Sequence, residues 1–275
     1  MTKIMIKKFI KVLSKPHLIP KKIINTIRFN SLKKKYNLRT YEKNQNLKFE
    51  QLGLDREKGI FYLNQLKKKN PVLIRRMSSE HETLFSSISL LKKREYLNIL
   101  EIGTHDGINS YLLSLLFENS KIKTIDLEST DYEFQNSYNR EKNYINFIKQ
   151  RDKLIKERKN IFFKEQNSLS LINTNEKYDL IWVDGAHGYP TVCIDIINSL
   201  KLITNNGLIL CDDVFTNKPK NQDKIYSSIA SFETISALKK EKLINFHLIF
   251  KRLEAQNNCD PNKRKFIAVI NKKFV

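Results

Sequence analysis

Acidic residues and one histidine follow two apolar segments of this chain, in positions where they could perform metal or acid–base chemistry. The run IWVDGAHGYP places Asp184 after an apolar stretch and His187 three residues later, and the run GLILCDD ends in Asp212 and Asp213. If the two runs are neighbouring strands, these carboxylates meet at one edge of a sheet and repel each other unless a cation lies among them. Oxygen ligands suit a hard ion, so Asp184, Asp212 and Asp213 predict an Mg²⁺ site.

Two roles are open for each of these groups. His187, whose imidazole has an ordinary pKa of about 6.5, can act as the general base that takes a proton from an acceptor hydroxyl. A metal ion would assist by lowering the pKa of that hydroxyl. Alternatively, His187 caps the following helix or binds a ligand through water, and Asp212 and Asp213 cap the segment after them. The spacing of His187 from Asp184 favours the general base.

A glycine-containing turn follows an earlier apolar run. In LEIGTHDG, Glu101 precedes a turn that contains Gly103, Thr104 and Gly107. Glycine permits a tight turn and the close approach of a ligand, but the G-x-x-x-G spacing differs from the G-x-G-x-x-G that binds a pyrophosphate. Glu101 can accept hydrogen bonds from a cationic ligand group and would repel a phosphate. An ordinary strand–helix turn is the alternative.

Polar residues also follow the next two apolar runs. Asp126 ends the run KIKTID, 23 residues after Gly103, and an acid at about this distance commonly binds a ribose diol. Asn167 and Ser168 follow the run NIFFKEQ, and their short polar side chains could bracket a purine ring. These positions together favour a ligand that contains a nucleoside.

From residue 97 onward, short apolar runs alternate with helical stretches. Strands are expected at 97–102, 121–127, 160–166, 178–184, 207–213, 246–253 and 263–273, with helices at 107–117, near 138–158, and at 190–203 and 224–244. Such alternation predicts a parallel sheet with helices on both faces, whereas the last two strands are joined too closely for a crossover and must pair antiparallel. We therefore expect an α/β, Rossmann-like doubly wound sheet of five parallel strands, with a C-terminal antiparallel hairpin and an N-terminal helical extension.

The polar motifs resemble, in their order along the chain, those of a known enzyme class. EIGTHDG, TIDLE, QNSL, DLIWVDGAHGYP and GLILCDDV are similar to motifs of class I S-adenosyl-L-methionine (SAM)-dependent methyltransferases. The similarity is to the methyltransferase-24-type branch, related to catechol, caffeoyl-CoA and macrolide-sugar O-methyltransferases, and it covers roughly residues 97–273. It implies methyl transfer from SAM to a hydroxyl of a small molecule, such as a sugar or another polyhydroxyl metabolite.

The resemblance also assigns roles to individual residues. The implied SAM-binding residues are Glu101, Gly103, Thr104, Gly107, Asp126, Asn167, Ser168 and Asp184. In the catechol-type relatives, acidic residues at the positions of Asp184, Asp212 and Asp213 hold the metal. In the macrolide-sugar relatives, a histidine at the position of His187 is the general base.

The N-terminal region is strongly basic. Residues 1–50 contain 14 Lys/Arg and two Glu, so they carry +12 of the net charge of +21. Within residues 3–15, apolar side chains and lysines segregate to opposite sides of a predicted helix. Such a helix could bind an anionic membrane from the cytoplasmic side, pack on its own domain or contact a partner, and these interpretations remain open. We divide the chain into a basic helical arm (1–50), a helical extension packed on the catalytic domain (51–95) and a methyltransferase domain (96–275).

Composition restricts the location and the partners. Lysines interrupt the apolar residues near the N-terminus and no run of about 18 apolar residues exists, so neither a signal peptide nor a membrane-spanning helix is expected. Three scattered cysteines favour a reduced, cytoplasmic setting. A homo-oligomer stays open.

Two other functions compete with small-molecule methylation. A nucleic-acid methyltransferase would suit the basic charge, but VDGAHGYP stands where base-modifying enzymes carry [DN]-P-P-[YFW], so a nucleic-acid partner is disfavoured. A non-catalytic SAM-binding or membrane-surface protein is the third interpretation, and retention of Asp184, His187 and Asp213 argues against it.

Overall fold

The computed structural model describes residues 19–74, 79–93, 95–137, 144–219 and 227–273, with side-chain detail from residue 23 onward. The amphipathic segment predicted at residues 3–15 lies outside this part of the chain. Within the described residues, no helix combines the length and apolarity needed to cross a membrane.

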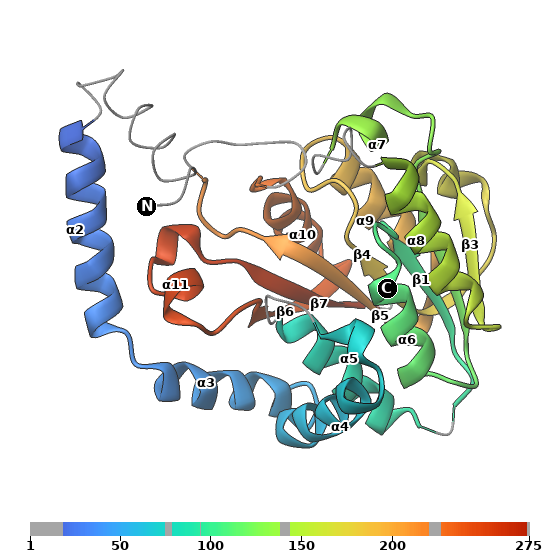
Figure 1. Cartoon of the computed structure of the whole chain (residues 1–275), viewed down its shortest axis with the longest axis horizontal. Helices are drawn as coiled ribbons and strands as arrows, with labels where there is room; N and C mark the ends of the chain where they lie inside the picture. Colours follow the sequence, from blue (N-terminus) through green and yellow to red (C-terminus); the bar gives the residue numbers. More distant parts are fainter. Residues whose placement is uncertain (1–18, 75–78, 94, 138–143, 220–226, 274–275) are drawn as a thin grey trace.

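A seven-stranded sheet forms the centre of the molecule (Figure 1). In spatial order its strands are β3 (Ile161–Glu165), β2 (Lys121–Asp126), β1 (Asn98–Ile102), β4 (Tyr178–Val183), β5 (Ile203–Val214), β7 (Phe266–Lys272) and β6 (Ile244–Phe250). The first five are parallel, and β7 runs antiparallel between β5 and β6. The predicted doubly wound sheet with its terminal hairpin is confirmed.

Helices cover both faces of this sheet because strand side chains alternate between two apolar layers. Along β4, Leu180 and Trp182 join one cluster, whereas Ile181 and Val183 join the other. The first layer is covered by α4 (Arg56–Lys69), α5 (Glu80–Leu91), α6 (Ile108–Leu116) and α8 (Tyr144–Lys156). The second is covered by α9 (Thr191–Leu202) and α10 (Ala230–Lys240). Short elements complete the chain: η2 (Pro71–Leu73), α7 (Tyr132–Asn136), η4 (Ser168–Asn173), α11 (Ala255–Asn258) and η5 (Pro261–Lys263).

Two further helices precede α4 in the chain. Helix α2 (Ile19–Lys35) extends away from the sheet, whereas α3 (Leu38–Glu50) lies near edge strand β6 (Figure 1). The side chain of Gln45 in α3 binds both backbone groups of Phe250: its amide nitrogen donates to the carbonyl (2.9 Å) and its oxygen accepts from the N–H (3.0 Å). These bonds satisfy the backbone groups of Phe250 at the end of edge strand β6, where unpaired groups could otherwise pair with another strand.

The terminal hairpin brings two distant segments to the active edge of the sheet. Strands β6 and β7 pair with Phe250 opposite Phe266, and β7 pairs antiparallel with β5. The residues just after β6 and just before β7 therefore lie beside the carboxyl end of β5. A bulge between Cys211 and Val214, with Asp213 at φ 53°, interrupts the β5–β7 ladder there. Bulges redirect side chains, and this one lies at the two acidic residues that the sequence singles out.

Candidate functional site

A cavity of about 290 Å³ lies at the carboxyl ends of β1, β2, β3 and β4. Of the residues predicted to bind a cofactor, those that line it are Gly103, Asp126, Asn167, Ser168 and Asp184. The sequence missed further lining residues, including Asp131, Phe134, Gln166, Thr191 and Asp195. Its position at the carboxyl edge is the one that the topology predicts for a ligand.

Gly103 is required by the close approach of two backbones at the floor of the cavity. Its φ is +102°, and a Cβ atom placed on it would lie 2.3 Å from the carbonyl oxygen of Asp184. No other residue type satisfies both the backbone angle and the space, so the predicted role of Gly103 as a tight-turn residue is supported by the geometry.

Asp126 ends β2 with its carboxylate held by backbone amides. Its Oδ2 accepts a hydrogen bond from the N–H of His105 (2.8 Å), and its Oδ1 accepts from the N–H of Leu127 (2.9 Å). A carboxylate has about four lone-pair positions, so each oxygen of Asp126 can accept a further hydrogen bond. Asp126 lines the cavity, where a ligand could donate such a bond. This fixed orientation suits the binding of two neighbouring hydroxyls.

Glu101 takes a different role from the one expected. Its side chain is fully buried and accepts hydrogen bonds from Asn109 Nδ2 (2.7 Å), Thr124 Oγ1 (2.7 Å) and the Ser110 hydroxyl. These partners belong to α6 and β2, and Glu101 is not among the residues that line the cavity. We therefore correct the prediction: Glu101 joins α6 to the sheet instead of receiving a cationic ligand group. The reason is the alternation along β1, which directs Glu101 beneath α6.

Thr104 and Gly107 also lie outside the lining of the cavity. The Thr104 hydroxyl is buried 2.6 Å from that of Thr124, and Gly107, with φ +76°, is the N-cap of α6. A Cβ atom on Gly107 would lie 3.3 Å from the side chain of Ile155. Both residues thus position α6, and their predicted contact with the cofactor is not supported by the arrangement.

Asp195 is the lining residue with the clearest need for a ligand. It lies on α9, its side chain is 1% exposed, and neither carboxylate oxygen has a partner in good hydrogen-bond geometry among the described residues. Burial raises the pKa of Asp195 to about 6, while the nearby Ser168 hydroxyl opposes the shift. A buried acceptor without a partner is costly, and a ligand donor entering the cavity would satisfy it. The sequence offered one indication that Asp195 is a functional residue: this acidic residue stands within the apolar run VCIDII.

The SAM implied by the sequence motifs fits this cavity. Gly103 leaves the space that a Cβ atom would fill, Asp126 presents an oriented carboxylate, and Asp195 offers an unsatisfied acceptor. Asn167 and Ser168 line the same cavity, and their contact with a purine ring stays a prediction.

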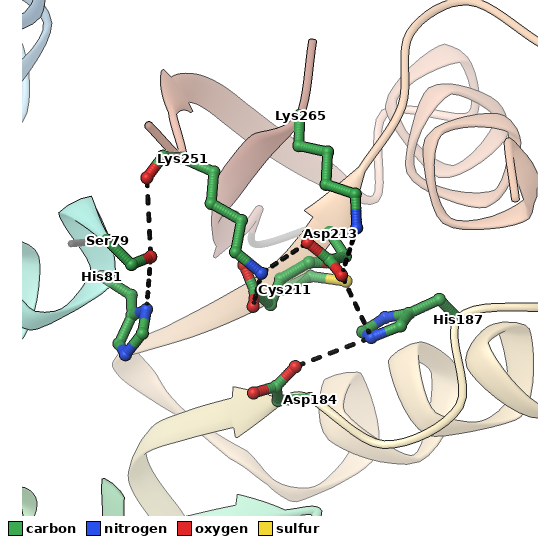
Figure 2. A network of polar contacts seen from close by, with 9 residues as sticks. Ser79, His81, Asp184, His187, Cys211, Asp213, Lys251 and Lys265 are labelled. Carbon is green, nitrogen blue, oxygen red and sulfur yellow. Dashed lines mark hydrogen bonds and ion pairs between the residues drawn. The ribbon is translucent and has the colours of Figure 1, made fainter. Parts of the chain in front are cut away.

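A second group of polar side chains adjoins Asp184 (Figure 2). His187 is 3% exposed, and its Nε2 lies 3.6 Å from Asp184 Oδ1 and 3.7 Å from Asp213 Oδ2. Figure 2 shows the side chains of His187, Lys251 and Lys265 pointing toward Asp213. The sequence prediction that Asp184, His187 and Asp213 meet is confirmed by these distances, whereas both lysines were missed.

Burial and charge set the protonation of this group. Burial lowers the pKa of His187 despite the raising effect of Asp213, which favours the neutral imidazole. Burial would raise the pKa of Asp213, but Lys251, His187 and Lys265 outweigh it and hold that pKa well below its ordinary range. Asp184, whose side chain is 34% exposed, has a raised pKa because neighbouring protein atoms exclude water and Asp212 repels its charge.

The predicted Mg²⁺ site does not fit these side chains as they are arranged. Lys251 Nζ lies 2.5 Å from Asp212 Oδ2 and 2.5 Å from Asp213 Oδ1, and Lys265 Nζ lies 2.6 Å from Asp213 Oδ2. Ammonium groups thus occupy both oxygens of Asp213 and one oxygen of Asp212, which a metal at this position would need. Among the described residues, no group of three or more His, Cys, Asp or Glu side chains is arranged to hold a metal ion.

Comparison with known proteins finds a family model that matches the central part of the chain. Residues 100–214 match the model of a methyltransferase domain family. No curated protein shows significant sequence similarity to the chain.

Solved structures share the fold at low identity. One is a candidate O-methyltransferase from Klebsiella pneumoniae, which is 15% identical with a TM-score of 0.52 over 77% of this chain and 96% of the other. Another is the O-methyltransferase TomG from Streptomyces achromogenes, involved in tomaymycin synthesis and solved with SAM; it is 15% identical with a TM-score of 0.51 over 83% of this chain and 96% of the other. The solved structures therefore show the fold of this chain, and the methyltransferase domain model matches its central part.

Proposed function

We propose that the protein transfers a methyl group from SAM to a hydroxyl of a small polyhydroxylated molecule, with His187 as the general base. The observation that carries this proposal is the position of His187: its imidazole is buried beside Asp184 and Asp213, and it directly follows the cavity-lining residues Gly185 and Ala186. Burial lowers the pKa of His187, which favours the neutral form that a base requires. The two O-methyltransferase folds are consistent with a hydroxyl acceptor, and the polyhydroxylated class of acceptor follows from the resemblance of the sequence motifs.

The chain's residues divide the reaction between two neighbouring sites. SAM, when bound, supplies a methyl group on a sulfonium ion. Gly103, Asp126 and Asp195 would bind and orient its nucleoside part in the cavity. His187 Nε2 would take the proton of the acceptor hydroxyl, and the nearby carboxylates of Asp184 and Asp213 would stabilise the imidazolium that forms.

This arrangement suggests that the close placement of cofactor and acceptor supplies most of the rate acceleration. Methyl transfer requires the acceptor oxygen to approach the methyl carbon in line, and holding both reactants in adjacent sites supplies much of the acceleration. Carboxylates at this edge favour binding of the cationic cofactor, and the site must tolerate the loss of positive charge from sulfur during transfer.

The test measures release of S-adenosylhomocysteine with a panel of sugars, other polyols and amines as acceptors. His187→Ala should lower turnover on the active hydroxyl acceptor by about 100-fold or more, the scale of a lost general base, and leave S-adenosylhomocysteine affinity unchanged. His247→Ala, on edge strand β6, is the matched control and should retain full turnover. Methylation of amines alone, or full activity of His187→Ala, would refute the proposal.

A further inference from the structure

Lys251 and Lys265 form a cationic pair at the edge where the carboxylates suggested a metal ion. Their Nζ atoms contact Asp213 on its two different oxygens, at 2.5 Å and 2.6 Å, and Lys251 also contacts Asp212 (Figure 2). The Lys251 side chain is only 9% exposed, so water screens its ion pair with Asp212 far less than it screens a surface ion pair. The two ammonium groups together carry the charge of one divalent ion.

The hairpin topology places both lysines there. Lys251 follows β6 and Lys265 precedes β7, and the N–H of Lys251 donates to the carbonyl of Lys265 (3.0 Å). The Lys251 carbonyl in turn accepts from the N–H of Glu80 at the start of α5 (2.9 Å). The backbone of Lys251 is thus held from two sides, and its side chain reaches the β5 bulge as part of the fold.

Electrostatics explain why this position holds a lysine. Burial disfavours the charged form of Lys251, but the negative charges of Asp212 and Asp213 outweigh burial and raise its pKa. Removing a partner from such a buried cluster leaves uncompensated charge, so the carboxylates require a cation of some kind. The structure supplies that cation from the chain itself.

We propose that Lys251, supported by Lys265, is a built-in cation of the acceptor site that takes the place of a divalent metal. This inference rests on the proposed O-methyl transfer. A lysine ammonium has three donors, and Asp212 and Asp213 receive two of them, which leaves one for the acceptor oxygen.

The chemistry then balances without a metal. The acceptor oxygen forms its bond to the methyl carbon, the carbon–sulfur bond breaks with its electron pair going to sulfur, and the acceptor proton passes to His187 Nε2. Lys251 keeps its own protons throughout and stabilises the negative charge that develops on the acceptor oxygen.

The test asks whether removing the ammonium group converts the carboxylates into a metal site. Mn²⁺ binding is measured by electron paramagnetic resonance on the wild-type protein, on Lys251→Met and on the control Lys272→Met, which changes an exposed lysine at the other end of β7. Wild type and control should show no stoichiometric Mn²⁺ site. Lys251→Met should bind Mn²⁺ at least about tenfold more tightly, and Mg²⁺ should raise its Tm but not that of wild type.

Two results would overturn the inference: equal Mn²⁺ affinity in wild type and Lys251→Met, or no Mn²⁺ binding in either. If Lys251→Met does not fold, Lys251→Gln removes the charge while keeping an amide donor and serves in its place. Binding of S-adenosylhomocysteine verifies that each variant is folded. Because Mn²⁺ binding does not depend on turnover, failure of this inference is distinguishable from failure of the proposed methyl transfer.

Discussion

Replacing Asp195 by Asn should make the unliganded protein increasingly stable, relative to wild type, as the pH rises from 5 to 7.5. Asp195 is 1% exposed and lacks a well-aligned hydrogen-bond partner among the described residues, and burial raises the pKa of its carboxyl from 3.8 to about 6. The folded protein therefore holds this proton more tightly than the unfolded chain does. The free energy of unfolding is therefore highest, as far as Asp195 is concerned, below about pH 4, where the carboxyl is neutral in both states. It decreases as the pH rises through about 6, where the folded protein loses this proton.

The size of the effect follows from the shift. A difference of about two pKa units corresponds to about 3 kcal/mol of unfolding free energy, reached above pH 7, and about 1.4 kcal/mol of it falls between pH 5 and pH 7.5. Asn does not titrate, so the variant escapes this loss. Its buried amide has a constant cost of about 1–3 kcal/mol for unmade hydrogen bonds, which cancels when two pH values are compared.

Urea unfolding at pH 5, 6 and 7.5 measures the effect. The stability of Asp195→Asn relative to wild type should increase with pH. Asp55→Asn is the control: the backbone N–H of Lys58 lowers the pKa of exposed Asp55, so this carboxyl is ionised in the folded and unfolded states throughout pH 5–7.5, and the stability of the variant relative to wild type should not change with pH in this range. A relative stability of Asp195→Asn that is flat or falls between pH 5 and pH 7.5 would refute the argument. If Asp195 binds a cofactor donor, the same variant should bind S-adenosylhomocysteine about 1 kcal/mol more weakly.

Three further predictions concern the cavity and the arm. Gly103→Ala should lower the unfolding free energy by at least about 1–3 kcal/mol, whereas Gly53→Ala, with a similar positive φ and open space around it, should lose less; equal losses in urea unfolding would contradict the clash with Asp184. Asp126→Ala should weaken S-adenosylhomocysteine binding by about 1–3 kcal/mol in calorimetry, and unchanged affinity would remove Asp126 from the site. Deletion of residues 1–16 should reduce salt-sensitive binding to anionic vesicles without changing cofactor affinity; an intact chain that ignores such vesicles at low salt would exclude the membrane role.

Local pattern predicted the order of the elements well. Strand and helix differ in apolar period, so the alternation from residue 97 onward is visible in the sequence, and the observed strands lie within or close to the predicted ranges. The longest deviation is β5, which begins at Ile203 because the ladder resumes directly after α9. Parallel topology then places the ends of β1 to β5 at one edge, which is why Gly103, Asp126 and Asp184 could be assigned to a common cavity.

Side-chain direction could not be read from the same pattern. Both faces of this sheet are covered by helices, so a strand-end carboxylate can face a helix or the ligand cavity. Glu101 lies beneath α6 with three protein donors, whereas Asp126 lines the cavity. Asp195 likewise has the sequence surroundings of an ordinary helix residue, and only the packing of α9 brings it to the cavity wall.

The sequence by itself determined the fold class, the active edge and the meeting of Asp184, His187 and Asp213, because each follows from local period and strand order. Only the tertiary structure decided which cation faces Asp212 and Asp213. Lys251 is 39 and 38 residues away from them along the chain, and it reaches them because β7 enters the sheet antiparallel between β5 and β6. Repulsion among carboxylates predicts that a positive charge must be present, but it does not distinguish a metal ion from an ammonium group, since that choice depends on long-range strand pairing.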